Sequence, residues 1–144
     1  MNIAMLLPAL LLGQTAPQAS VDGLPLGAIP RQTLPAHGCA AFLWSVGTTR
    51  ALVAMASAEP GSLRLSIDGT ITDLPRDTQQ GAAGFGFAET TAYRAGTTTA
   101  ILVMSVKTRG DLKEGAAVSD ATLRLDREGK DSIVLPVAGM IGCT

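Results

Sequence analysis

Four side chains near the two ends of the expected β domain could bind a soft metal ion. His37 lies two residues before Cys39, and Met140 lies three residues before Cys143. Imidazole, thioether and thiolate groups are the ligands that select Cu(I). If the first and last strands pair, all four groups meet, so a periplasmic copper-binding carrier is one hypothesis. The sequence has no methionine-rich run, and methionine within a strand is an ordinary core residue, so we predict no metal site and no cofactor.

The same two cysteines have a simpler interpretation as a structural disulfide. Cys39 opens the first strong strand-like run, and Cys143 closes the last one, one residue before the C-terminus. In an exported protein, two cysteines at opposite ends of a small domain typically pair. A bond that closes a loop of about 100 residues stabilises the fold by about 4–5 kcal/mol in the chain-entropy model. The sequence therefore predicts a Cys39–Cys143 disulfide.

The sequence offers little for catalysis. A Ser–His–Asp or Cys–His arrangement needs a base, and the only histidine is His37, in a Pro-Ala-His-Gly stretch with no G-x-S-x-G motif elsewhere. Paired carboxylates could serve a glycosidase, but the candidates lie near arginine or lysine and are interpreted as solvated turn charges. These candidates are Asp68, Asp73, Asp77, Asp120, Asp126, Glu128 and Asp131. We predict no catalytic residues and keep a small hydrolase as a less favoured alternative.

Aromatic residues gather around the glycine-rich stretch Gly81–Gly86. This stretch has the composition of a phosphate-binding loop, but it does not connect a strand to a helix N-terminus, so we interpret it as a flexible loop. Phe85, Phe87, Tyr93 and Arg94 border it. Aromatic and arginine side chains are enriched at protein interfaces. The sequence predicts the partner-binding site at these four residues.

The N-terminal segment is typical of an export signal. Ile3–Gly13 is almost wholly apolar, and small residues follow at Ala16 and Ala19. The apolar run is too short to span a bilayer, which needs about 20 residues, and its length fits a signal peptide cleaved near Ala19. A buried N-terminal strand or helix is the alternative. We predict a signal peptide over residues 1–19, a periplasmic or secreted location, and no membrane span after cleavage.

The remaining chain reads as a lead-in followed by one β domain. Residues 20–36 are rich in proline and glycine and are expected to be extended, with at most a short edge strand. Cys39–Val46 is apolar on both faces, which predicts a central strand that buries both Phe42 and Trp44. Asp68-Gly69 is a favoured type I′ hairpin turn. Loops or single helical turns are expected at 76–84 and 110–117.

About eight strands at spacings of 8–12 residues predict an all-β fold, either an antiparallel β-sandwich or a small barrel, stapled by one disulfide. Residues 37–144 form a single β domain in this interpretation. Basic and acidic residues nearly cancel, at 11 and 12, so nucleic-acid binding is not expected. We expect an exported, non-enzymatic binding or assembly module of the bacterial cell envelope, with an envelope protein as its partner.

Overall fold

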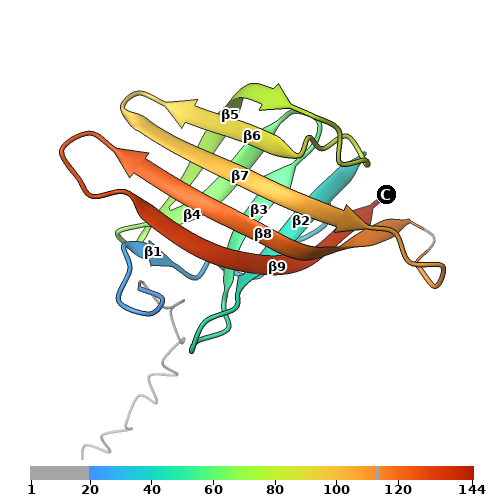
Figure 1. The fold of residues 1–144 in the computed structure, drawn as a ribbon, viewed down its shortest axis with the longest axis horizontal. Coiled ribbons are helices and arrows are strands. Elements are labelled where there is room, and N and C mark those ends of the chain that lie inside the picture. The colour runs from blue at the N-terminus through green and yellow to red at the C-terminus, as the bar shows by residue number, and fades with distance from the viewer. Residues whose placement is uncertain (1–19, 113) are drawn as a thin grey trace, which may run out of the picture.

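The computed structural model describes residues 20–112 and 114–144, and these residues form a fold built from nine β-strands (Figure 1). The strands are β1 Leu26–Gly27, β2 Cys39–Ser45, β3 Leu52–Ser57, β4 Ser62–Ile67, β5 Thr70–Gln80, β6 Thr90–Ala95, β7 Thr98–Lys107, β8 Gly115–Arg127 and β9 Ile133–Cys143. All pairs of neighbouring strands are antiparallel. The predicted all-β antiparallel class is therefore confirmed.

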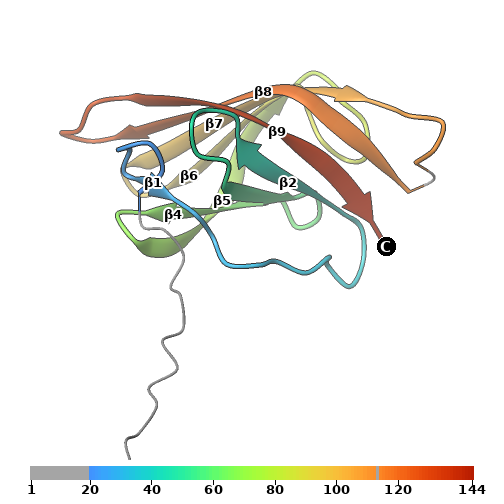
Figure 2. The same ribbon diagram turned by 90° about the horizontal axis from the view of Figure 1, so that it is seen from below.

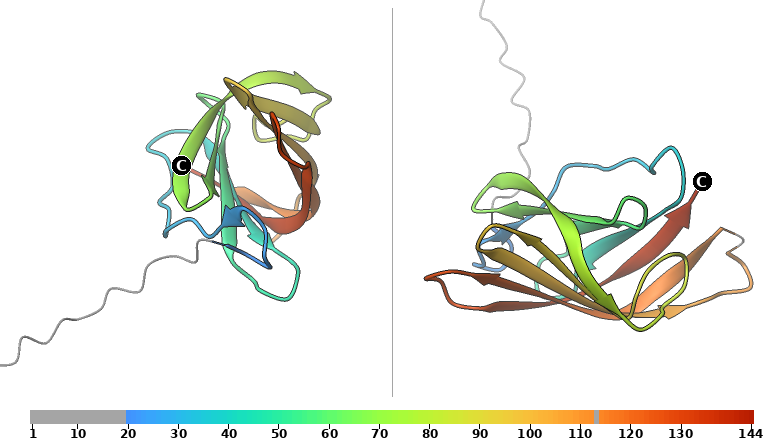
Figure 3. Two further views of the ribbon diagram at one scale, coloured as in Figure 1. Left: turned by 90° about the vertical axis from the view of Figure 1, so that its left-hand side faces the viewer. Right: turned by 90° about the horizontal axis from the view of Figure 1, so that it is seen from above.

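Of the two predicted architectures, the fold is a closed barrel. From β2 to β9 each strand pairs with the next along the chain, and β9 returns to pair with β2. The β9–β2 pairing closes a ring of the eight strands β2 to β9, and β1 is an extra strand beside β4. The left-hand view of Figure 3 shows the strands around a common interior. A closed ring has an inner and an outer face, so each strand buries only its inward row unless another segment covers the outside.

Inward-pointing side chains fill the barrel. Large residues that are almost wholly buried come from alternate positions of several strands, as the two-residue period of a strand requires. Examples are Leu43, Leu63, Leu65, Leu74, Tyr93, Leu102, Leu123 and Leu125. The core is aliphatic, with Tyr93 as its largest member.

Of the turns and loops predicted from the sequence, one hairpin turn agrees with the structure and two other segments differ from it in part. Asp68 and Gly69 both have positive φ, at 49° and 80°, as the predicted type I′ turn between β4 and β5 requires. The expected loop at 76–84 is wrong in its first half, because β5 continues to Gln80 and pairs with β6. The single turn expected at 110–117 is wrong in its second half, since β8 begins at Gly115, whereas the Leu112 amide donates to the Arg109 carbonyl in a turn at the start of this stretch. A Cβ at Gly115 would lie 2.4 Å from the Ile141 carbonyl oxygen, so glycine permits this close strand approach.

The lead-in is an integral part of the fold. Val21 and Leu26 are fully buried in the core, and β1 extends the sheet beside the end of β4. The chain then runs along the outside of the barrel before it enters β2 (Figure 2). Gln32 accepts a hydrogen bond from Arg64 on β4, and Leu34 lies over Gly142 on β9. We call this segment, residues 28–38, the strap. It explains why Ala40 is fully buried although it points away from the interior.

The predicted signal peptide, residues 1–19, lies outside the described residues. Within the part of the chain that is described, no helix is long and apolar enough to cross a membrane.

Candidate functional site

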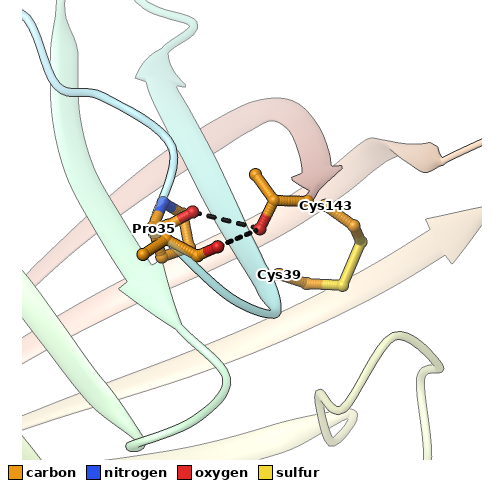
Figure 4. Close-up of a disulfide and its surroundings, with 5 residues drawn as sticks. Pro35, Cys39 and Cys143 are labelled. Atoms are coloured by element: carbon orange, nitrogen blue, oxygen red, sulfur yellow. Dashed lines mark hydrogen bonds between the residues drawn. A yellow bond between two sulfur atoms is a disulfide. The ribbon is translucent and has the colours of Figure 1, made fainter.

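The two cysteines form the predicted disulfide between the first and last strands of the barrel (Figure 4). Cys39 and Cys143 are direct partners in the β2–β9 register, with their Cα atoms 4.1 Å apart. Their backbone groups bond away from each other: Ala58 donates to the Cys39 carbonyl, and Cys143 donates to the Glu114 carbonyl. A non-hydrogen-bonded pair of this kind brings Cα atoms closest, and a disulfide can span it. A structural disulfide indicates a non-cytoplasmic compartment.

The C-terminal residue ties the strap to this junction. The Thr144 hydroxyl shares its single hydrogen between the carbonyl oxygens of Pro35 and Ala36, both at 3.1 Å (Figure 4). The Thr144 amide donates to the Gly38 carbonyl. The strap, β2 and β9 are therefore held together at one end of the barrel.

The four copper-ligand candidates do not converge. The Cys39 and Cys143 sulfurs are bonded to each other and pack against the core. Met140 occupies the alternate row of β9 and is 54% exposed on the outside, and His37 is exposed before β2. Among the described residues, no group of three or more His, Cys, Asp or Glu side chains is placed to hold a metal ion. The arrangement gives the copper hypothesis no support.

Several candidate carboxylates are held in ion pairs on the surface. Asp73 accepts two hydrogen bonds from Arg64, at 2.8 and 3.0 Å, and these lower its pKa. The pKa of Asp126 is also lowered, mainly by the Ser132 hydroxyl and further by Arg124. Asp68 pairs with Arg127 at 2.7 Å. A lowered pKa keeps Asp73 and Asp126 ionised, which is unsuited to a general acid near neutral pH.

The structure separates the four residues predicted to bind a partner. Phe87 and Tyr93 are only 7% and 2% exposed and belong to the core, where burial raises the pKa of the Tyr93 hydroxyl. Phe85 is half-buried against the same core, with a positive φ of 57° between two glycines. Arg94 is exposed, and its Nε donates to the Gly96 carbonyl. The four residues therefore do not share one surface, and partner binding through them stays a prediction without a common contact face.

A different apolar surface lies on the outside of the barrel. On β2 and β9 the outward rows meet in register, with Phe42 beside Met140 and Trp44 beside Ala138. Trp44 is 37% exposed and Val46, just beyond β2, is 45% exposed. We call Phe42, Trp44, Val46, Ala138 and Met140 the β2–β9 outer surface. The expectation that Trp44 is a core residue is wrong, because no described segment covers this part of the outer face.

This outer surface contains an open hollow of about 410 Å³. Trp44, Val46, Ala138 and Met140 line it, together with Ser45, Gly139 and Arg50. Ser45 is satisfied within the fold, because its hydroxyl donates to the Thr49 carbonyl and accepts from the Ala51 amide. At Gly139 a Cβ would lie 1.8 Å from the Phe42 carbonyl oxygen, so the two strands can approach this closely only at glycine. The hollow is suited to binding an apolar group.

A signal for this surface was present in the sequence. Cys39–Val46 is apolar at both alternating rows, the pattern that predicted burial on both sides, and Ile133–Val137 is also apolar at both rows. In a closed barrel the outward row of such a strand faces solvent. Two adjacent strands of this type therefore mark an exposed apolar surface, once the topology places them side by side.

Comparison of the chain with protein-family models, curated proteins and solved structures finds no match.

Proposed function

We propose that this protein is an exported, non-enzymatic binding or assembly module of the bacterial cell envelope. It docks a protein partner through the β2–β9 outer surface. The observation that carries the proposal is the exposure of Trp44, Val46 and Met140 on adjacent strands around one hollow. A contiguous apolar patch on a small soluble domain marks an interaction site. Its chemistry, apolar groups with one arginine, is suited to binding rather than to proton or group transfer.

Export is supported by two independent features. The disulfide between Cys39 and Cys143 is typical of an oxidising compartment. Residues 1–19 have the composition of a signal peptide. Together they favour the periplasm or the extracellular space.

The composition of the surface matches known interface chemistry. Tryptophan, methionine and arginine are enriched at protein–protein contacts, and tryptophan and arginine dominate binding hot spots. The hollow brings one of each together in Trp44, Met140 and Arg50.

The test is quantitative affinity capture from cell-envelope extract with the tagged protein and two variants. Met140→Lys places a charge on the proposed surface. Val103→Lys is the matched control, because Val103 is similarly exposed, at 46%, on β7. Circular dichroism verifies that both variants are folded.

We expect the wild type and Val103→Lys to recover the same partner, and Met140→Lys to lose it. Equal recovery by Met140→Lys would contradict the proposed surface.

A further inference from the structure

The hollow on the β2–β9 outer surface is lined mainly by apolar side chains, and the hydroxyl of Ser45 is already bonded within the fold. Of the residues that line it, Arg50 alone is charged. Arg50 lies in the turn between β2 and β3 and is exposed to solvent. Any group that fills the hollow therefore meets apolar side chains and one guanidinium.

Arg50 is not neutralised by its own chain. Arg64, Arg109, Arg124 and Arg127 each form an ion pair with an aspartate. Within residues 20–112 and 114–144, Arg50 takes part in no such pair. Its five N–H donors remain available to a carboxylate, which a guanidinium binds in bidentate geometry.

The shape favours a polypeptide over a small molecule. Small-molecule sites are concave and bury most of their ligand. Here the hollow is open, and the outward row of β9 continues from it through Pro136 to Val134, which is 58% exposed. An elongated apolar strip beside a single anchoring hollow fits a chain segment that lays one side chain into the hollow.

We propose that this site recognises a partner polypeptide in which a bulky apolar side chain is followed or preceded closely by an aspartate or glutamate. The apolar side chain occupies the hollow between Trp44 and Met140, and the carboxylate pairs with Arg50. This inference rests on the proposed function and names the chemistry of the partner.

The experiment is selection of a random-peptide display library on the disulfide-bonded protein purified from the compartment to which it is exported. We expect enriched peptides to carry an acidic residue next to a bulky apolar one. Trp44 is the only tryptophan, so its fluorescence reports binding at the hollow directly. Each enriched peptide, synthesised singly, should change the emission of Trp44 in a saturable way.

A charge reversal tests the arginine. Arg50→Glu should weaken the binding of these peptides about fivefold or more, and selection on this variant should enrich basic residues in place of acidic ones. Arg31→Glu is the matched control, because Arg31 is exposed on the strap and does not line the hollow. It should leave the affinity unchanged.

Four results would overturn the inference: no enrichment, enrichment without an acidic bias, equal binding by Arg50→Glu, or sedimentation as a dimer that Met140→Lys dissociates. The last would assign the surface to a second copy of the chain. The proposed function fails separately, when captured partners are indifferent to Met140→Lys. A partner that depends on Met140 but binds Arg50→Glu with wild-type affinity would leave the proposed function standing and remove only the acidic specificity.

Discussion

The loop over residues 81–89 and the β2–β9 outer surface both gather aromatic and apolar side chains, yet they differ in burial. In the loop, Phe87 is 7% exposed and packs into the core, and Phe85 lies half-buried beside it. On the outer surface, Trp44 and Met140 are 37% and 54% exposed. A connection at the end of a barrel can fold its side chains over the interior, whereas an outward-pointing row needs a second layer. The same residue types therefore stabilise the fold in one place and remain free for contact in the other.

The largest expected effect concerns the bond that joins the two strands of the outer surface. Cys39→Ser with Cys143→Ser should lower the free energy of unfolding by about 4–5 kcal/mol, because the bond closes a loop with a sequence separation of 104. Urea denaturation of the oxidised protein and of the double variant measures this difference. A loss below about 1 kcal/mol would show that the strand pairing alone holds β2 against β9.

Truncation of one aromatic side chain in each region tests whether the two regions differ in their contribution to stability. Phe87→Ala should destabilise the protein by about 3–5 kcal/mol, since it removes a buried side chain. Trp44→Ala should cost about 1 kcal/mol or less, because the indole is partly in solvent. Thermal and urea unfolding of the two variants compare them. A larger loss of stability in Trp44→Ala than in Phe87→Ala would show that the indole, and not the Phe87 ring, is the core residue.

Gly139, which lines the hollow, tests how closely β2 and β9 approach each other. Gly139→Ala should destabilise by about 1–3 kcal/mol or more, because its Cβ would overlap the Phe42 carbonyl oxygen. The control is Gly110→Ala, where a Cβ would have no neighbour within 4 Å and φ is not positive. Equal unfolding midpoints for the two variants would show that β2 and β9 do not approach closely at this point.

The smallest expected effect on the stability of the fold comes from an ion pair on the outer face, between Arg64 and Asp73. The Arg64 guanidinium lowers the pKa of Asp73 in the folded state, so the pair stabilises the protein above the unfolded pKa. This stabilisation is lost as the pH falls through the folded pKa. Because both side chains are largely exposed, the contribution is a few tenths of a kcal/mol.

Unfolding measured between pH 7 and pH 3 for the wild type and Arg64→Gln should show a slightly shallower pH dependence in the variant. Identical profiles would show that the Arg64–Asp73 pair does not contribute to the free energy of unfolding.

Local sequence patterns specified many elements of the fold but not its closure. Asp68-Gly69 identified the turn between β4 and β5, because a two-residue hairpin turn depends only on near neighbours. The disulfide followed from the positions of Cys39 and Cys143. Closure into a barrel depends on the pairing of β2 with β9, which lie far apart in the sequence, and no local pattern records that pairing.

The candidate surface was missed for the same reason. The sequence of an apolar strand face is the same whether or not a second layer covers that face. The sequence therefore predicted Trp44 as a core residue. Phe87 and Tyr93 were assigned to the surface because they border a glycine-rich loop. The topology decides both cases, since it shows which rows point inward.

Site-specific photo-crosslinking in the producing cells shows directly whether the partner contacts the β2–β9 outer surface. Benzoylphenylalanine is placed at Met140 on the outer surface in one variant, at Phe85 in the loop in a second, and at Val103 on β7 in a third. We expect one discrete protein adduct from position 140 only, abolished by Trp44→Ala in the same chain. An adduct from position 85 or 103 with none from 140 would contradict this expectation and move the contact away from β2 and β9.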